Sequence, residues 1–321
     1  MSAAPGRSQA SSHRSPQGEG TPVSAAPAVA VVGAGNMGGA MVERLRDAGW
    51  PVAVCDIDPA RQRQALAAGA SLVDTPRAAA SVLGAQGALI LVVVDAAQCC
   101  EVLWGSDGAA EALQAGQTVV LCPTIAPEDA ENIAGRLASG GVDCIDAPMS
   151  GGPVRARDGR MSLMVAAPDA VLARHTALLA ALSDHVMRVS ERVGDGARTK
   201  LVNNLLAGIN LVGAAEVLAM AERMGLDLST TLDVIERSSG QSWIGLDRMR
   251  RAVAGDYAPR AHVTLLEKDT RLAVAAGRAA GFEGPLGARA ARVFVDAHEA
   301  GMADLDDAAL FQLLRQTPPR P

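Results

Sequence analysis

The chain has 321 residues, of which 49% are hydrophobic but only 2% aromatic, and its formal net charge at neutral pH is −6. This length suits two domains with large cores, which must be built mainly from Ala, Val, Leu and Met. The acidic balance, with no run of Lys or Arg, argues against nucleic-acid or anionic-membrane partners, and the longest strictly apolar run, 88–94, is too short to span a bilayer.

The cysteines and the first segment bear on the cellular compartment. The five cysteines show no Cys-x-x-Cys spacing and no two histidines stand at ligand spacing, so we interpret the cysteines as reduced thiols and predict no metal site. Residues 1–27 are rich in Ser, Ala, Pro and Gly without hydrophobic periodicity, which predicts a disordered tail. Because this tail has no continuous apolar core, a signal peptide is not expected, and we predict a cytoplasmic protein.

The first structured pattern is a short apolar strand, 29–32, that leads into Gly33-Ala34-Gly35-Asn36-Met37-Gly38 and a helical pattern ending at Gly49. In Gly-x-Gly-x-x-Gly the first glycine allows the turn, the second lets a pyrophosphate approach the backbone, and the third lets the helix pack closely on the strand. The phosphates would bind the free N–H groups of the helix start.

A second strand, 52–55, supports this interpretation because Asp56 follows it, 18 residues after Gly38. An acidic residue at that strand tip accepts a hydrogen bond from a ribose 2′-hydroxyl and repels a 2′-phosphate, which predicts NAD as the cofactor. The alternative is a glycine-rich turn that binds no ligand.

Alternation of strands and helices continues to about Glu191. Asp58-Pro59 and Thr75-Pro76 each place an N-cap residue before a proline at the first helical position. The remaining predicted strands are 88–94, 118–121, 142–145, 162–166 and 185–189, and helices are predicted at 107–115, at 127–138 and from Pro168. Unbroken apolar runs are typical of a parallel sheet covered on both faces, so residues 28–191 are predicted to form a doubly wound α/β domain of Rossmann type.

After Gly194 the strand patterns end. Residues 197–224 form one long helical pattern, and segments 229–237, 243–254, 262–280 and 285–300 also look helical. We therefore predict that residues 192–321 form an all-α domain for substrate binding and oligomerisation.

Three further groups of residues bear on chemistry. Ser150-Gly151-Gly152 follows a strand end, where open α/β sheets bind ligands, and its hydroxyl and unhindered backbone N–H groups can cradle a carboxylate, although a plain turn is the alternative. Lys200 lies near the start of the long helix with Asn204 one turn further on.

Partial desolvation and the positive end of the helix dipole would both lower the pKa of Lys200, which makes it a candidate general acid or base. A solvated lysine at a helix start is the alternative. The third group is the charged run 267–269, and taken alone such a run favours a solvated helix face.

Together, the segments 33–38, 146–152, 194–204 and 268–269 resemble, in order and spacing, the four signatures of the β-hydroxyacid dehydrogenase family, which includes 3-hydroxyisobutyrate dehydrogenase. The resemblance covers about residues 28 to 315. It implies a Rossmann domain and a helical domain with the active site between them, and assembly as a homodimer or homotetramer.

By this resemblance Lys200 transfers the proton, Asn204 orients a small hydroxy acid, and Ser150, Gly151 and Gly152 bind its carboxylate. Lys268 would close the cofactor side of the site. Thr124 would lie beside the nicotinamide, although proline replaces the serine that the family usually has before it.

The turn Asp95-Ala96-Ala97-Gln98 and the segment 239–243 resemble the L-threonate dehydrogenase branch of the family, which usually has asparagine at the position of Asp95. Gln98 and Gln241 are therefore candidate contacts for the hydroxyl groups of a four-carbon sugar acid. The alternatives within the family are a 3-hydroxyisobutyrate dehydrogenase and a tartronate semialdehyde reductase. An imine reductase is disfavoured because such relatives generally lack the lysine, and a non-catalytic dinucleotide-binding module would have lost part of the site.

Overall fold

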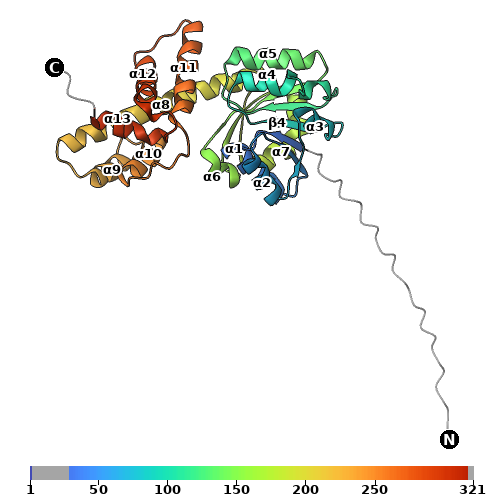
Figure 1. Ribbon diagram of the computed structural model, residues 1–321, viewed down its shortest axis with the longest axis horizontal. Helices are drawn as coiled ribbons and strands as arrows, with labels where there is room; N and C mark the ends of the chain where they lie inside the picture. Colours follow the sequence, from blue (N-terminus) through green and yellow to red (C-terminus); the bar gives the residue numbers. More distant parts are fainter. Residues whose placement is uncertain (2–28, 317–321) are drawn as a thin grey trace.

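The computed structural model describes residue 1 and residues 29–316, so the predicted tail, 1–27, lies outside the described residues except for residue 1. The described part forms a sheet lobe followed by a helical lobe (Figure 1). The sheet strands are β1 (Val29–Val32), β2 (Val52–Cys55), β3 (Ser71–Leu72), β4 (Ala88–Leu91), β5 (Thr118–Leu121), β6 (Asp143–Asp146), β7 (Met149–Ser150), β8 (Ser162–Ala166) and β9 (His185–Ser190). The predicted α/β architecture with a helical second lobe is confirmed.

The strand order is β3-β2-β1-β4-β5-β6-β8-β7, and β9 pairs with β8. Strands β1 to β6 are parallel, β8 is antiparallel to β6 and β7, and β9 is parallel to β8. The order reverses between β1 and β4, which is where dinucleotide-binding sheets open a crevice for their ligand.

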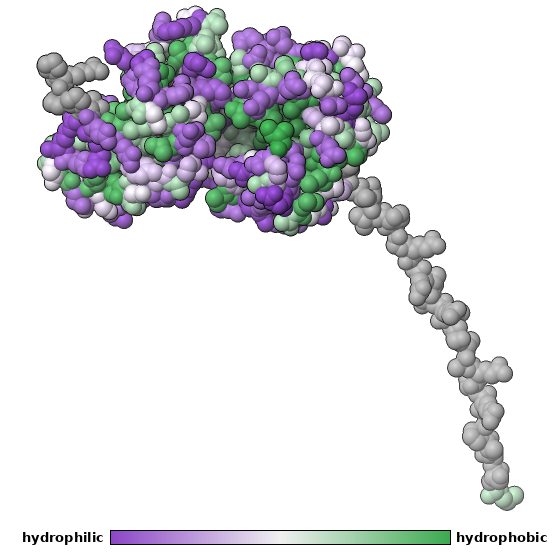
Figure 2. Space-filling model, viewed as in Figure 1, coloured by the Kyte–Doolittle hydropathy of each residue, from purple (hydrophilic) through white to green (hydrophobic). Residues whose placement is uncertain are grey.

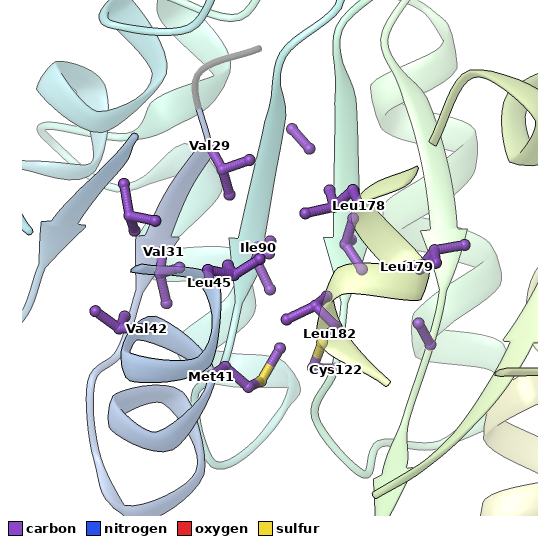
Figure 3. Packing of buried hydrophobic residues seen from close by; sticks show 14 of the residues in the cluster. Val29, Val31, Met41, Val42, Leu45, Ile90, Cys122, Leu178, Leu179 and Leu182 are labelled. Atoms are coloured by element: carbon purple, nitrogen blue, oxygen red, sulfur yellow. The ribbon is translucent and has the colours of Figure 1, made fainter. Parts of the chain in front are cut away.

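Helices cover both faces of this sheet. They are α1 (Asn36–Asp47), α2 (Pro59–Ala67), α3 (Pro76–Ser81), α4 (Ala96–Trp104), α5 (Pro127–Ala138), α6 (Gly152–Arg157) and α7 (Asp169–Leu182). Alternate residues of β1 lie in different cores: Val31 belongs to the core that also contains Leu45 and Leu182 (Figure 3), whereas Val32 belongs to the core on the other face. Burial on both faces explains why the strands are apolar throughout.

The region after β4 differs from the prediction. The strand ends at Leu91 rather than at residue 94, and α4 follows where only a turn was expected, because the Asp95 side chain accepts the N–H of Gln98 and caps the helix. The predicted helix 107–115 is wrong. A single 3₁₀ turn, η1 (Ala109–Glu111), stands there, since Gly108 packs so closely on the end of α4 that an added Cβ would lie 2.5 Å from the Leu103 carbonyl oxygen.

The helical lobe is built around α8 (Asp195–Arg223), a helix of 29 residues. The others are α9 (Leu228–Glu236), α10 (Trp243–Val253), α11 (Val263–Ala279), α12 (Gly287–Ala297), a π-helical turn (His298–Met302), η3 (Asp307–Ala309) and α13 (Leu310–Gln316). Helices α10 to α13 pack on α8 around a core that includes Leu211, Met249, Phe294 and Phe311. Among the described helices, α8 alone is long and apolar enough to cross a membrane by length and composition, and 39% of its apolar window is buried within the protein.

Candidate active site

The glycine fingerprint adopts the geometry that a dinucleotide needs. Gly33 has φ +92°, and a Cβ at Gly38 would lie 1.9 Å from the Gly33 carbonyl oxygen, so both positions require glycine. Around Gly35, in contrast, a Cβ would meet no protein atom within 4 Å. Gly35 is also the N-cap of α1 and supplies no side-chain cap, which leaves the first N–H groups of α1 available to a pyrophosphate.

An acidic group at the tip of β2 and a basic group on α2 lie beside the glycine loop. Asp56 Oδ2 accepts the Ala34 N–H at 2.5 Å, so the carboxylate borders the glycine loop. Arg61 Nη2 donates to Asn36 Oδ1 at 2.9 Å, which places a guanidinium beside the same loop. Met37 packs against the core beneath and holds this helix start on the sheet.

The Ser-Gly-Gly turn lies at the end of β7, where Ser150 pairs with Ser162 of β8. Gly151 has φ +124° and Gly152 has φ +75°, conformations that L-residues rarely adopt. A Cβ at Gly152 would meet nothing within 4 Å, so its backbone is open to a ligand.

Asp146 joins this strand end to the start of α8. Its side chain is 2% exposed, and Oδ2 accepts the N–H groups of Gly194 and Ala197 at 2.8 and 2.9 Å. The bonds satisfy two donors at a helix start that has no side-chain cap of its own. Burial raises the pKa of Asp146 to about 6, although these backbone bonds oppose the shift.

Lys200 and Asn204 are buried on one face of α8, 7% and 8% exposed. Asn204 Nδ2 donates to Asp269 Oδ2 of α11 at 2.6 Å. Burial lowers the pKa of Lys200 to about 8, because desolvation disfavours the ammonium; the Asp269 carboxylate opposes this shift and the Lys268 ammonium adds to it. The amine can therefore accept or release a proton near neutral pH.

Lys268 connects the two lobes. Its Nζ donates to the Thr124 backbone carbonyl at 2.5 Å, beyond the end of β5, and lies 3.0 Å from Asp269 Oδ1. The surface is hollowed between the lobes (Figure 2), and the Lys268–Thr124 bond crosses from one to the other. The structure thus brings four predicted site residues, Lys200, Asn204, Lys268 and Thr124, to one junction.

The two glutamines that were predicted to contact substrate lie on exposed segments. Gln98 is in the first turn of α4, and its Oε1 accepts the Val94 N–H at 2.9 Å, so its side chain stabilises the turn that leads into this helix. Gln241 lies in the exposed loop before α10, where its backbone N–H donates to the Ser238 carbonyl.

Two buried carboxylates, Asp146 and Asp269, belong to the junction although no role was predicted for them from the sequence. Each had a signal: Asp146 is a charged residue at the end of a buried strand, and Asp269 follows Lys268 on the apolar side of its helix. Their partners lie 48 and 65 residues away along the chain, so only the folded structure identifies the contacts.

Two family models match the chain. The NAD-binding domain of 6-phosphogluconate dehydrogenase matches residues 28–190, and the NAD-binding domain of NADP-dependent 3-hydroxyisobutyrate dehydrogenase matches residues 194–314. L-Threonate dehydrogenase of Cupriavidus necator is 36% identical over 89% of this chain and 95% of its own length.

Two further relatives align with this chain over nearly their whole lengths. 3-Hydroxyisobutyrate dehydrogenase of Pseudomonas aeruginosa is 34% identical over 89% of this chain and 98% of its own. The crystal structure of a 3-hydroxyisobutyrate dehydrogenase from Salmonella typhimurium has a TM-score of 0.83 at 35% identity and covers 89% of this chain and 99% of that one. The chain therefore belongs to the β-hydroxyacid dehydrogenase family that includes 3-hydroxyisobutyrate dehydrogenase, and it is an oxidoreductase that acts on the CH–OH group of hydroxy acids with a nicotinamide dinucleotide.

Proposed function

We propose that the chain oxidises L-threonate, or a closely related four-carbon aldonate, with NAD, and that Lys200 is the general base. The observation that carries the chemistry is the buried Lys200 amine with a pKa of about 8, beside the Asn204–Asp269 pair at the junction of the lobes. A nicotinamide dinucleotide bound at the glycine loop beside Asp56 would supply the acceptor for the hydride of the carbinol carbon.

The protein supplies the proton transfer and the orientation. Neutral Lys200 takes the hydroxyl proton as the C–H bond breaks, so the carbinol loses a proton and a hydride and becomes a carbonyl. Asn204 is held by Asp269, which fixes its amide for a hydrogen bond to the substrate oxygen. Ser150 and the backbone N–H groups of Gly151 and Gly152 bind the substrate carboxylate.

The choice of substrate is supported by the L-threonate dehydrogenases among the relatives and by the polar loop before α10, which contains Gln241. A site that binds several hydroxyl groups rejects analogues that lack them, because its own polar groups would remain unpaired. NAD is favoured by Asp56, whose carboxylate would repel a 2′-phosphate.

The test is a comparison of kcat/KM for L-threonate, D-glycerate and 3-hydroxyisobutyrate, each followed by the absorbance of the reduced cofactor. We expect L-threonate to be oxidised much faster than 3-hydroxyisobutyrate. A higher value for either of the other acids would refute the substrate assignment and leave the fold and the family unchanged.

A further inference from the structure

The proposed carboxylate cradle has no charge of its own. Ser150 offers a hydroxyl, and Gly151 and Gly152 offer backbone N–H groups, all of them neutral donors. The two lysines at the junction have other partners or roles: Lys268 Nζ binds the Thr124 carbonyl and lies beside the Asp269 carboxylate, and Lys200 must be neutral to act as a base. A desolvated carboxylate is held most strongly by a charged donor.

Arg155 is a cation in contact with this cradle. It lies on the short helix α6, which follows directly from the Ser-Gly-Gly turn. Its stem covers the turn, since a Cβ at Gly151 would lie 2.9 Å from Arg155 Cδ. The side chain also lines an open cavity of 520 Å³ together with Ser162, the strand partner of Ser150, and with residues 185–187 of β9, so the guanidinium is accessible from solvent.

Trp243 holds the guanidinium from the other lobe. The Arg155 Cζ lies 4.8 Å from the centre of the Trp243 ring, and Trp243 is the first residue of α10 in the helical lobe. A cation over an aromatic face keeps its N–H donors free at the edge of the guanidinium plane. Among residues 29–316 no carboxylate forms an ion pair with Arg155, in contrast to Arg157, which pairs with Glu43 and Asp47 of α1.

We propose that Arg155 is a substrate-binding residue that supplies the positive charge for the carboxylate of the hydroxy acid, and that Trp243 positions its guanidinium across the mouth of the site. The proposal rests on the proposed function, because it takes the Ser-Gly-Gly turn as the carboxylate site. The positive charge of Arg155 would explain how the enzyme selects a carboxylate over an uncharged polyol derivative.

The experiment compares an acid with its primary amide, which has the same hydroxyl groups and no charge. The kcat/KM of the wild type, Arg155→Ala, Arg155→Lys and Arg157→Ala is measured with L-threonate and L-threonamide, and an inhibition constant replaces kcat/KM if the amide is not oxidised. We expect Arg155→Ala to lower kcat/KM for the acid about 10- to 150-fold, mainly through KM, and to change the value for the amide less than about threefold.

The lysine variant should recover part of the loss, because it keeps the charge without the planar fork. Arg157→Ala is the matched control: it lies two residues further on the same helix, is paired with α1, and should behave as the wild type. Trp243→Ala should weaken the preference for the acid in the wild type and have no effect in the Arg155→Ala background.

An equal loss for acid and amide in Arg155→Ala, or no loss for the acid, would overturn the proposal. Should the wild type prefer D-glycerate, the substrate assignment above is wrong, and Arg155 is then tested with D-glycerate and its amide. A failure of the proposed substrate is thereby distinguished from a failure of the Arg155 assignment.

Discussion

Lys200 lies between an ammonium and a carboxylate on the neighbouring helix, so its proton affinity depends on both. Burial lowers its pKa to about 8, the Asp269 carboxylate raises it and the Lys268 ammonium lowers it further. A general base must be neutral, and with this pKa only about a tenth of the amine is neutral at pH 7. We therefore expect the pH profile of the oxidation to report the charge state of Lys200.

We predict that kcat/KM for oxidation rises with pH and levels off above about 8, as the Lys200 ammonium loses its proton. Asp269→Asn removes the carboxylate that stabilises the ammonium, so the midpoint of the pH profile should move to lower pH.

Lys200→Ala removes the proposed base, so it should lower kcat about 10²- to 10⁴-fold while NAD still binds.

The control for the pH profile is Glu267→Gln. This carboxylate lies two residues before Asp269 but pairs with His298, and its loss should leave the midpoint unchanged. An unchanged midpoint in Asp269→Asn, or a Lys200→Ala variant with wild-type turnover, would contradict the assigned roles.

We expect the cofactor preference to depend on two opposite charges beside the glycine loop, Asp56 after β2 and Arg61 on α2. The Asp56 carboxylate would repel a 2′-phosphate, whereas Arg61, which is bonded to Asn36 at the glycine loop, would attract one. We expect the wild type to have the higher kcat/KM with NAD. Asp56→Ser should narrow the difference from NADP, and Arg61→Ala should widen it. A wild type that prefers NADP would refute the role given to Asp56.

The position of Lys200 depends on how the start of helix α8 is held. The helix has no side-chain cap, and the Asp146 carboxylate of the sheet lobe takes that role from 48 residues away. Since Lys200 lies one turn beyond Ala197, a loosened helix start would also displace the base.

We predict that Asp146→Ala destabilises the protein by about 1–3 kcal/mol, because two buried N–H groups lose their acceptor. Asp146→Asn keeps an acceptor oxygen and removes a buried charge, so it should cost less. The pKa of Asp146 is raised to about 6, so the folded state binds this proton more tightly than the unfolded chain does. The contribution of Asp146 to the free energy of unfolding therefore falls as pH rises from 4 to 6. Chemical denaturation of both variants and the wild type at pH 5 and 7 tests this, and an asparagine variant as unstable as the alanine variant would contradict it.

How much the sequence could predict differs between elements for physical reasons. Strands buried on both faces, such as β1, carry an unbroken apolar run, and capped helices such as α2 begin with a local signal, so both were predicted. Helix α4 was missed because its cap, Asp95, was interpreted as part of a turn, and the short β7 has only two residues and no pattern. Lys200 and Asn204 lie one turn apart on one helix, so the sequence alone indicates them as a candidate pair, whereas Arg155 and Trp243 lie on different lobes and only folding brings them together.

Hydride transfer requires the sheet lobe and the helical lobe to keep a fixed relative position. The glycine loop belongs to the sheet lobe and Lys200, the proposed base, to the helical lobe. The contacts that join the lobes include Asp146 to the start of α8, Lys268 to Thr124, and Arg155 to Trp243. Hydride transfer needs the reacting atoms within about 3–3.5 Å, so the spacing of the lobes is itself part of the catalytic geometry.

We propose that the outer face of α8 is a surface for self-association. Val202, Leu206 and Met220 are 72%, 58% and 55% exposed, and this face carries few charges, although it belongs to the central helix of the lobe. Exposed apolar surface of this kind on a folded protein marks an interface. A second copy of the chain is the occupant we propose, because covering this face would hold α8, and with it Lys200, more rigidly in place.

We therefore predict that the protein is a homodimer or homotetramer at micromolar concentration, measured by size-exclusion chromatography with light scattering. The double variant Leu206→Glu with Met220→Glu should shift it to a smaller species, because paired copies would bury uncompensated carboxylates. Leu66→Glu on α2, also an exposed leucine at 52%, is the control and should keep the wild-type mass. A monomeric wild type would refute the prediction, and a double variant that keeps the wild-type mass would place the interface on another face of the molecule.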